Sequence, residues 1–242
     1  MNWPTYLDDA GIMAKSREKG GQTLAQHTWQ VLERLRDQHL LHPHTDARVW
    51  RWLYWGGLLH DFGKAADGFQ RMLAKEPDNG WVEARHRHEV LSLAFADWLF
   101  PKKHPDRPWV LAVIAFHHKD FDKITDKYGG RHAMREMGTD NADSVKKQIR
   151  FLAGQITGGV RALLWRWLRD CGDDWARELQ LPAKPPELIS EAEAVQTNLD
   201  KAVFQALRDL SSWRDELNAA DKLKAMLCRG FIVSADHAAS AD

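Results

Sequence analysis

Residues 58–64 read LLHDFGK, in which a His-Asp pair stands at the end of an apolar run and just before a glycine and a lysine. The adjacent His60 and Asp61 offer an imidazole and a carboxylate to one point in space. Carboxylate oxygens can bridge two cations while the imidazole holds one of them, and borderline divalent metals accept this mixture of ligands. A His-Asp pair alone is weak evidence, because it more often marks a solvated helix end. The pair indicates a metal site only if other polar residues also fall within apolar helical patterns.

Composition places the chain among ordinary globular proteins. Of its 242 residues, 44% are hydrophobic and 28% charged, and 34 basic residues balance 34 acidic ones. Net charge therefore gives no hint of a nucleic-acid or membrane partner. Cys171 and Cys228 lie far apart, which argues against a disulfide framework or a cysteine zinc site. Because the chain shows neither a long apolar run nor a signal-peptide pattern, we expect a cytoplasmic protein.

Helical patterns cover most of the chain and strand alternation is absent, so we predict an all-α fold of several packed helices in one compact domain. Thr23 and Gln26 have the spacing of a capping box that opens a helix. The pair Gly56-Gly57 is unfavourable in a helix and predicts close approach of a second helix. Another helix is expected from Glu83 onwards. Most of the 12 tryptophans are expected in the core.

Two histidines fall on the inner faces of these helices. His27 shares a helical stripe with Leu24 and Val31, although for this residue alone a core histidine hydrogen-bonded to a carbonyl is the favoured interpretation. His88 lies on the apolar stripe of the helix expected from Glu83. His86 lies about 200° round that helix and is expected outside. A metal ligand is therefore assigned to His88.

The pair His117-His118 closes an almost wholly apolar helix that starts near Pro108. Adjacent residues diverge by about 100° on a regular helix, so both can bind one metal only if the helix ends or distorts there. Either one singly could be a solvated helix end. Asp236 lies on a late apolar stripe, where a carboxylate is best explained by a cation or a buried partner.

Lysines flank these candidate ligands. Lys64, one turn beyond His60, could reach a phosphate oxygen or simply favour the helix C-terminus. Lys119, Lys123 and Lys127 recur every four residues directly after the histidine pair. Because aspartates are interleaved, this stripe could be a solvated, salt-bridged face. Its position beside the candidate site favours the alternative, contact with a phosphate backbone.

The order and grouping of these residues closely resembles the HD superfamily of metal-dependent phosphohydrolases. More narrowly, it is similar to the HD nuclease domain of the CRISPR type I interference nuclease-helicase. The resemblance spans about residues 20–240 and rests on residues 25–28, 60–64 and 87–89, the doubled histidine, and residues 235–240. The sequence departs from the pattern at His237, where the family often has Trp. We expect that change to affect packing more than metal binding.

Carried over residue by residue, the resemblance implies a multi-helix HD-domain fold with two divalent metal ions between its helices. One ion would be held by His27, His60, Asp61 and Asp236, and a second by Asp61 as a bridge together with His88, His117 and His118. Asp61 and Lys64 would be catalytic, with Lys64 beside the scissile phosphate. Histidine-rich ligation favours manganese, iron, cobalt or nickel over magnesium.

The resemblance also implies a nuclease that cleaves single-stranded DNA, as an endonuclease or exonuclease, by metal-activated attack of water on the phosphodiester. Its partners would be single-stranded DNA, a helicase in cis or in trans, and an RNA-guided type I surveillance complex, with no membrane. Residues 1–242 would form a single HD nuclease domain, and the stop after the last motif favours a fragment of a longer nuclease-helicase. Two alternatives stay open: an HD phosphohydrolase acting on nucleotides or cyclic nucleotides, and a non-catalytic regulatory or scaffold domain.

Overall fold

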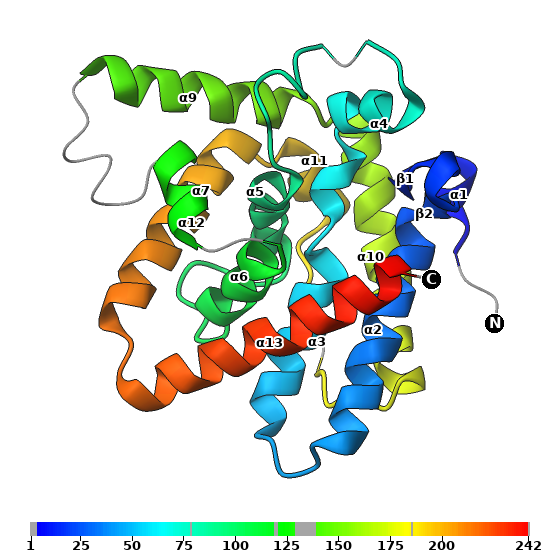
Figure 1. The fold of residues 1–242 in the computed structure, drawn as a ribbon, viewed down its shortest axis with the longest axis vertical. Helices are drawn as coiled ribbons and strands as arrows, with labels where there is room; N and C mark the ends of the chain where they lie inside the picture. The colour runs from blue at the N-terminus through cyan, green and yellow to red at the C-terminus, as the bar shows by residue number, and fades with distance from the viewer. Residues whose placement is uncertain (1–3, 78, 119–120, 129–138, 185, 242) are drawn as a thin grey trace.

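The chain folds into helices joined by turns, as Figure 1 shows, and the expected all-α fold is confirmed. The computed structural model describes residues 4–77, 79–118, 121–128, 139–184 and 186–241. The elements in chain order are α1 (Tyr6–Asp9), β1 (Met13–Lys15), the 3₁₀ turn η1 (Arg17–Lys19), β2 (Gln22–Thr23), α2 (Leu24–Leu41), α3 (Ala47–Leu59), η2 (Phe62–Ala65), α4 (Asp67–Ala74), α5 (His88–Ser92), η3 (Leu93–Trp98), α6 (Arg107–Phe116), α7 (Phe121–Tyr128), α9 (Thr139–Gly154), α10 (Gly158–Glu178), α11 (Glu191–Gln196), α12 (Leu199–Glu216) and α13 (Ala219–Ala241).

The first long helix begins where its capping residues predict. Thr23 Oγ1 accepts a hydrogen bond from the Gln26 amide at 3.2 Å, and Gln26 Oε1 accepts one from the Thr23 amide at 3.1 Å. This reciprocal pair satisfies two amides that a helix start leaves without partners. The predicted capping box is therefore confirmed, and α2 runs from there to Leu41.

Two local predictions were wrong. The helix expected from Glu83 begins only at His88, because the preceding residues form turns and Arg85 has a positive φ of 50°. Strands also occur where none was expected, since β1 and β2 pair antiparallel in a two-stranded sheet. These strands span three and two residues, which is too short for alternation to be visible in the sequence.

The tryptophans fill the core, as expected. Ten of the 12 are buried and Trp213 packs partly buried against the same core. Trp52 stacks flat on Trp109, with ring centroids 4.2 Å apart and planes 5° from parallel. These indoles are consequently turned inward rather than presented to a partner. Within the described ranges, none of the helices is both long and apolar enough to cross a membrane.

Helix α3 lies among α2, α6 and α13, and α13 crosses the face of the molecule in front of α3 (Figure 1). Two glycines permit this close packing, as the sequence predicted. A Cβ atom at Gly56 would lie 2.4 Å from Val113 Cγ1 on α6. A Cβ atom at Gly57 would lie 3.2 Å from Leu35 Cδ1 on α2 and 3.6 Å from Ile232 Cδ1 on α13. The C-terminal end of α3 is thus held between the three helices.

The α3–α6 contact predicts opposite effects for the same substitution at two helical glycines. Gly56→Ala should lower the free energy of unfolding by about 1–3 kcal/mol, because the new methyl group overlaps Val113. Gly230→Ala on α13 meets no atom within 4 Å and should raise it by about 0.5–1 kcal/mol. Urea denaturation measures both. Equal effects of the two substitutions would contradict the packing described for α3.

Candidate metal centre

The turn between α3 and η2 carries His60 and Asp61 into the centre of the helix packing. Gly63 lies two residues after Asp61, and its amide donates a 2.8 Å hydrogen bond to Ser92 Oγ on α5. A Cβ atom at Gly63 would lie 2.0 Å from the carbonyl oxygen of His88. Only glycine therefore fits there. This close contact brings the first residue of α5, His88, up to the side chain of Asp61.

The first group of side chains is completely buried and comes from α2, α13 and the turn after α3. His27 Nε2 lies 3.2 Å from Asp61 Oδ2 and 3.0 Å from Asp236 Oδ1. His60 Nε2 lies 3.2 Å from Asp61 Oδ2 and 3.7 Å from Asp236 Oδ1. One nitrogen or oxygen atom from each of the four residues lies within 4.8 Å of all the others. That spacing suits a single metal ion.

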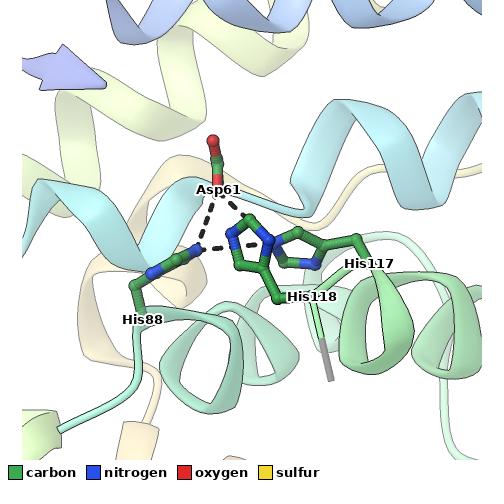
Figure 2. Close-up of side chains that lie close together, drawn as sticks. All are labelled: Asp61, His88, His117 and His118. Carbon is green, nitrogen blue, oxygen red and sulfur yellow. Dashed lines mark hydrogen bonds and ion pairs between the residues drawn. The ribbon is translucent and has the colours of Figure 1, made fainter. Parts of the chain in front are cut away.

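The second group lies on the other side of Asp61, and Figure 2 shows its four residues pointing toward one another. His88 Nε2 lies 3.0 Å from Asp61 Oδ1, and His117 Nε2 lies 3.7 Å from the same oxygen. His118 completes this group, again with ligand atoms within 4.8 Å. Asp61 therefore faces one group with Oδ2 and the other with Oδ1.

The helix α6 ends at Phe116, as convergence of the histidine pair required. His117 caps the helix and His118 follows in a turn. The two rings still lie close, with centroids 4.1 Å apart. His118 Nδ1 also lies 3.4 Å from Asp236 Oδ2, so this more exposed ring stands near both groups.

Hydrogen bonds on the outer side orient three of the imidazoles. His60 Nδ1 lies 2.6 Å from the carbonyl oxygen of Gly57, and His117 Nδ1 lies 2.7 Å from that of Ile114. Since a carbonyl can only accept, each Nδ1 carries the hydrogen and Nε2 is the inward nitrogen. Gln22 Oε1 lies 3.2 Å from His27 Nδ1 in the same role. Gln22 was not among the residues predicted from the sequence, because a residue in a two-residue strand follows no helical stripe.

Several buried polar atoms of the two groups form no hydrogen bond within the described part of the chain, although some lie in ion-pair contact. Both oxygens of Asp61, Oδ2 of Asp236 and Nε2 of His60 accept or donate no hydrogen bond there. Lys64 Nζ approaches Asp61 Oδ2 to 2.7 Å as an ion pair. Leaving so many buried polar atoms without partners costs several kcal/mol unless a further group binds them. The nitrogen and oxygen donors of the two groups, and their lack of hydrogen bonds, therefore fit the binding of divalent metal ions.

The pKa values of three histidines support this fit. Burial lowers the pKa of His88 to about 4 and the pKa values of His117 and His118 to about 3, so these rings are neutral donors at pH 7. Burial lowers the pKa of His60, but the carboxylates of Asp61 and Asp236 together more than offset burial, and the pKa rises to about 10. Burial acts to raise the pKa of Asp61, whereas His60, Lys64 and His27 together hold it well below its usual range. The central carboxylate is thus anionic and requires positive charge around it.

The lysine stripe is only partly described. Lys119 lies outside the described residues, and Lys123 is exposed. Lys127 is half-buried, and its Nζ donates to the backbone carbonyls of Ala84 and Arg85. This contact ties α7 to the segment that leads into α5. Lys127 therefore helps to fix the segment that positions His88.

His86 provides a control for the ligand assignment, because its ring stacks on Phe151 at 4.6 Å and belongs to neither group. His88→Ala should lose about one metal ion per chain, since it removes a nitrogen beside Asp61. His86→Ala should keep the wild-type metal content. Elemental analysis after dialysis against manganese measures both. Metal loss from His86→Ala with full content in His88→Ala would mean that the wrong histidine was assigned.

Comparison with known families agrees with this centre. Residues 20–242 match the family model described as Cas3, HD domain. Searches of curated proteins and of solved structures found no match. The matched range includes every residue of both ligand groups. The chain therefore belongs to the Cas3 HD-domain family, a family of metal-dependent nucleases of CRISPR systems.

Proposed function

We propose that this chain cleaves single-stranded DNA in type I CRISPR interference, using two divalent metal ions that share Asp61. The observation that carries the proposal is the position of this carboxylate, with Oδ2 toward one ligand group and Oδ1 toward the other. A phosphodiester is cleaved effectively between two ions held on a common bridge. The family match and the resemblance of the motifs support nucleic acid as the substrate.

His27, His60, Asp61 and Asp236 would hold one ion, and Asp61, His88, His117 and His118 the other. When bound, such ions lower the pKa of water and neutralise negative charge on phosphate oxygens. Five of these seven ligands are histidines, which favours manganese, iron, cobalt or nickel over magnesium. The protein contributes a site whose rings are held in place before substrate arrives.

Lys64 is proposed to contact the phosphate that is cleaved. Its side chain is buried, lies 6.0 Å from the centre of the Phe69 ring, and pairs with Asp61 Oδ2. An ammonium group beside the bridging carboxylate can bind an oxygen of an incoming phosphate and stabilise its charge during the reaction. Its role is thus separate from metal binding, because an ammonium group has no lone pair to donate.

Substrate binding outside the centre would use the backbone of the strand. Lys123 is exposed and suits a phosphate contact. Lys127 would have to break its hydrogen bonds to two backbone carbonyls before it could contact a phosphate. Lys119 is proposed as a phosphate contact from its position in the sequence alone. We further propose that a helicase, in cis or in trans, and an RNA-guided surveillance complex deliver the strand, and that the protein acts in the cytoplasm.

The direct test uses circular single-stranded DNA with manganese, nickel, magnesium or chelator. Linear product requires endonuclease action, because a circle has no ends. The wild-type protein should cut with at least one transition metal and lose this activity in chelator. Asp61→Ala should reduce the rate by about 10³-fold, since both ions lose their shared oxygen ligands. Electrophoresis of the products measures the rate.

A panel of linear DNA, nucleotides and cyclic nucleotides accompanies this assay. Cutting of linear strands alone would restrict the protein to exonuclease action. Hydrolysis of nucleotides without cleavage of any DNA would reject the nuclease proposal and favour a small-molecule phosphohydrolase. Absence of every activity with metal bound would favour the regulatory or scaffold alternative.

Lys64→Ala separates phosphate contact from metal binding. We expect DNA cleavage to fall about 10²-fold while metal content stays at the wild-type value. Lys184→Ala, at an exposed lysine outside both ligand groups, serves as the matched control and should cut normally. Elemental analysis and cleavage rates are measured on the same preparations. Loss of metal from Lys64→Ala would contradict the proposed phosphate role.

A further inference from the structure

A basic pocket lies between α9 and α12, on elements that contribute none of the candidate metal ligands. Its volume is about 450 Å³, and its lining consists of Lys102, Lys146, Arg150, Asp200, Lys201, Phe204, Gln205 and Arg208. Five cationic side chains and one carboxylate thus face one hollow. The whole chain has no net charge, so this concentration of positive charge is a local property.

Helical spacing explains why these cations face one another. Lys146 and Arg150 are four residues apart on α9, and Lys201 and Arg208 are seven apart on α12, so each pair lies on one face of its helix. The two helices pack together. The pocket is therefore lined by two basic helix faces, with Lys102 from the turn after η3 at its edge.

The charges in this pocket are incompletely neutralised. The side chains of Arg150 and Lys201 are exposed and form no hydrogen bond or ion pair within the described part of the chain. Lys146 pairs with Asp143 at 3.1 Å, and the nearby Asp209 accepts a hydrogen bond from Arg107 at 3.1 Å. Asp143 thus neutralises one of the five cations of the pocket, whereas Asp209 binds an arginine outside it. The cationic side chains that remain unpaired can bind an anionic ligand.

We propose that this pocket binds the phosphodiester backbone of a nucleic acid strand, as a second contact outside the metal centre. This inference rests on the proposed function, which brings such a strand to the chain. Cations spread along two helices suit a ligand with repeated negative charges better than a single small anion. Phe204 is half-buried in the lining and offers an aromatic surface on which a base can stack.

The pocket is linked to the centre through neighbouring elements. Helix α12 packs against α6, whose end carries His117 and His118. Helix α9 packs against α7, which follows the histidine pair in the chain. A strand held in the pocket would therefore contact α9 and α12, which pack against α7 and α6. Such a contact adds affinity without adding sequence preference.

Binding of labelled oligothymidylate, followed by fluorescence anisotropy in chelator, tests the proposal. The variant Arg150→Glu/Lys201→Glu reverses the two unpaired charges of the pocket. Lys184→Glu/Lys222→Glu reverses two exposed lysines elsewhere and gives the same net charge. We expect the pocket variant to bind roughly tenfold more weakly at about 50 mM salt. Its slope of log affinity against log salt should be smaller by about 1.4, and the control should stay within about twofold of wild type.

The milder Arg150→Gln/Lys201→Gln variant should lie between wild type and the charge reversal, and circular dichroism checks that all variants fold. Wild-type affinity in the pocket variants, or a loss no larger than in the control, would overturn the proposal. Polyglutamate serves as a second probe in the same assay. If the pocket variants lose binding to polyglutamate but bind oligothymidylate normally, the proposal is overturned in favour of an acidic protein partner.

Hydrolysis of bis-para-nitrophenyl phosphate with manganese separates this proposal from the proposed function. The pocket shares no residue with either ligand group, so the pocket variants should hydrolyse this small diester at the wild-type rate. A wild-type protein that binds the oligonucleotide through the pocket but hydrolyses neither diester nor DNA would contradict the proposed function alone. Slower diester hydrolysis in the pocket variants would overturn the inference of a separate contact.

Discussion

The carboxylate of Asp61, buried at the centre of the helix packing, imposes the requirement that the surrounding structure meets. A buried charge is expensive unless it is paired on every side. Helices α2, α5 and α6 each bring a histidine toward it, α13 brings Asp236 beside it, and the turn after α3 brings His60. Gly56, Gly57 and Gly63 matter because they let these elements approach closely enough. The core and the site are thus one packing arrangement.

The imidazole rings of two candidate ligands, His60 and His117, are held by the same kind of hydrogen bond. His60 follows the last turn of α3, and His117 follows the last turn of α6. Carbonyl groups at a helix end lack an amide partner, and here they accept from Nδ1 of the residue three positions later. The helix end is capped and the ring is fixed by one hydrogen bond. Placing a metal ligand directly after a helix therefore stabilises both.

Much of the candidate centre could be predicted from the sequence, since His27, His117 and Asp236 are polar positions in apolar helices. The division of the ligands into two groups is visible in the sequence only through resemblance, because it depends on packing between distant segments. The start of α5 was predicted too early, because residues 83–87 form turns despite their local preference for a helix. Backbone carbonyls of this segment accept hydrogen bonds from Lys127. Periodicity likewise shows that Lys127 lies on a stripe but not which carbonyls it contacts.

The central claim is that Asp61 lies between two metal ions. A crystal structure of the protein soaked in manganese, with an anomalous difference map, tests it most directly. The account predicts two peaks about 3.5–4 Å apart, on opposite sides of this carboxylate, one beside His27 and Asp236 and the other beside His88 and His117. A single peak bound by one group alone, or two peaks that do not share Asp61, would contradict it.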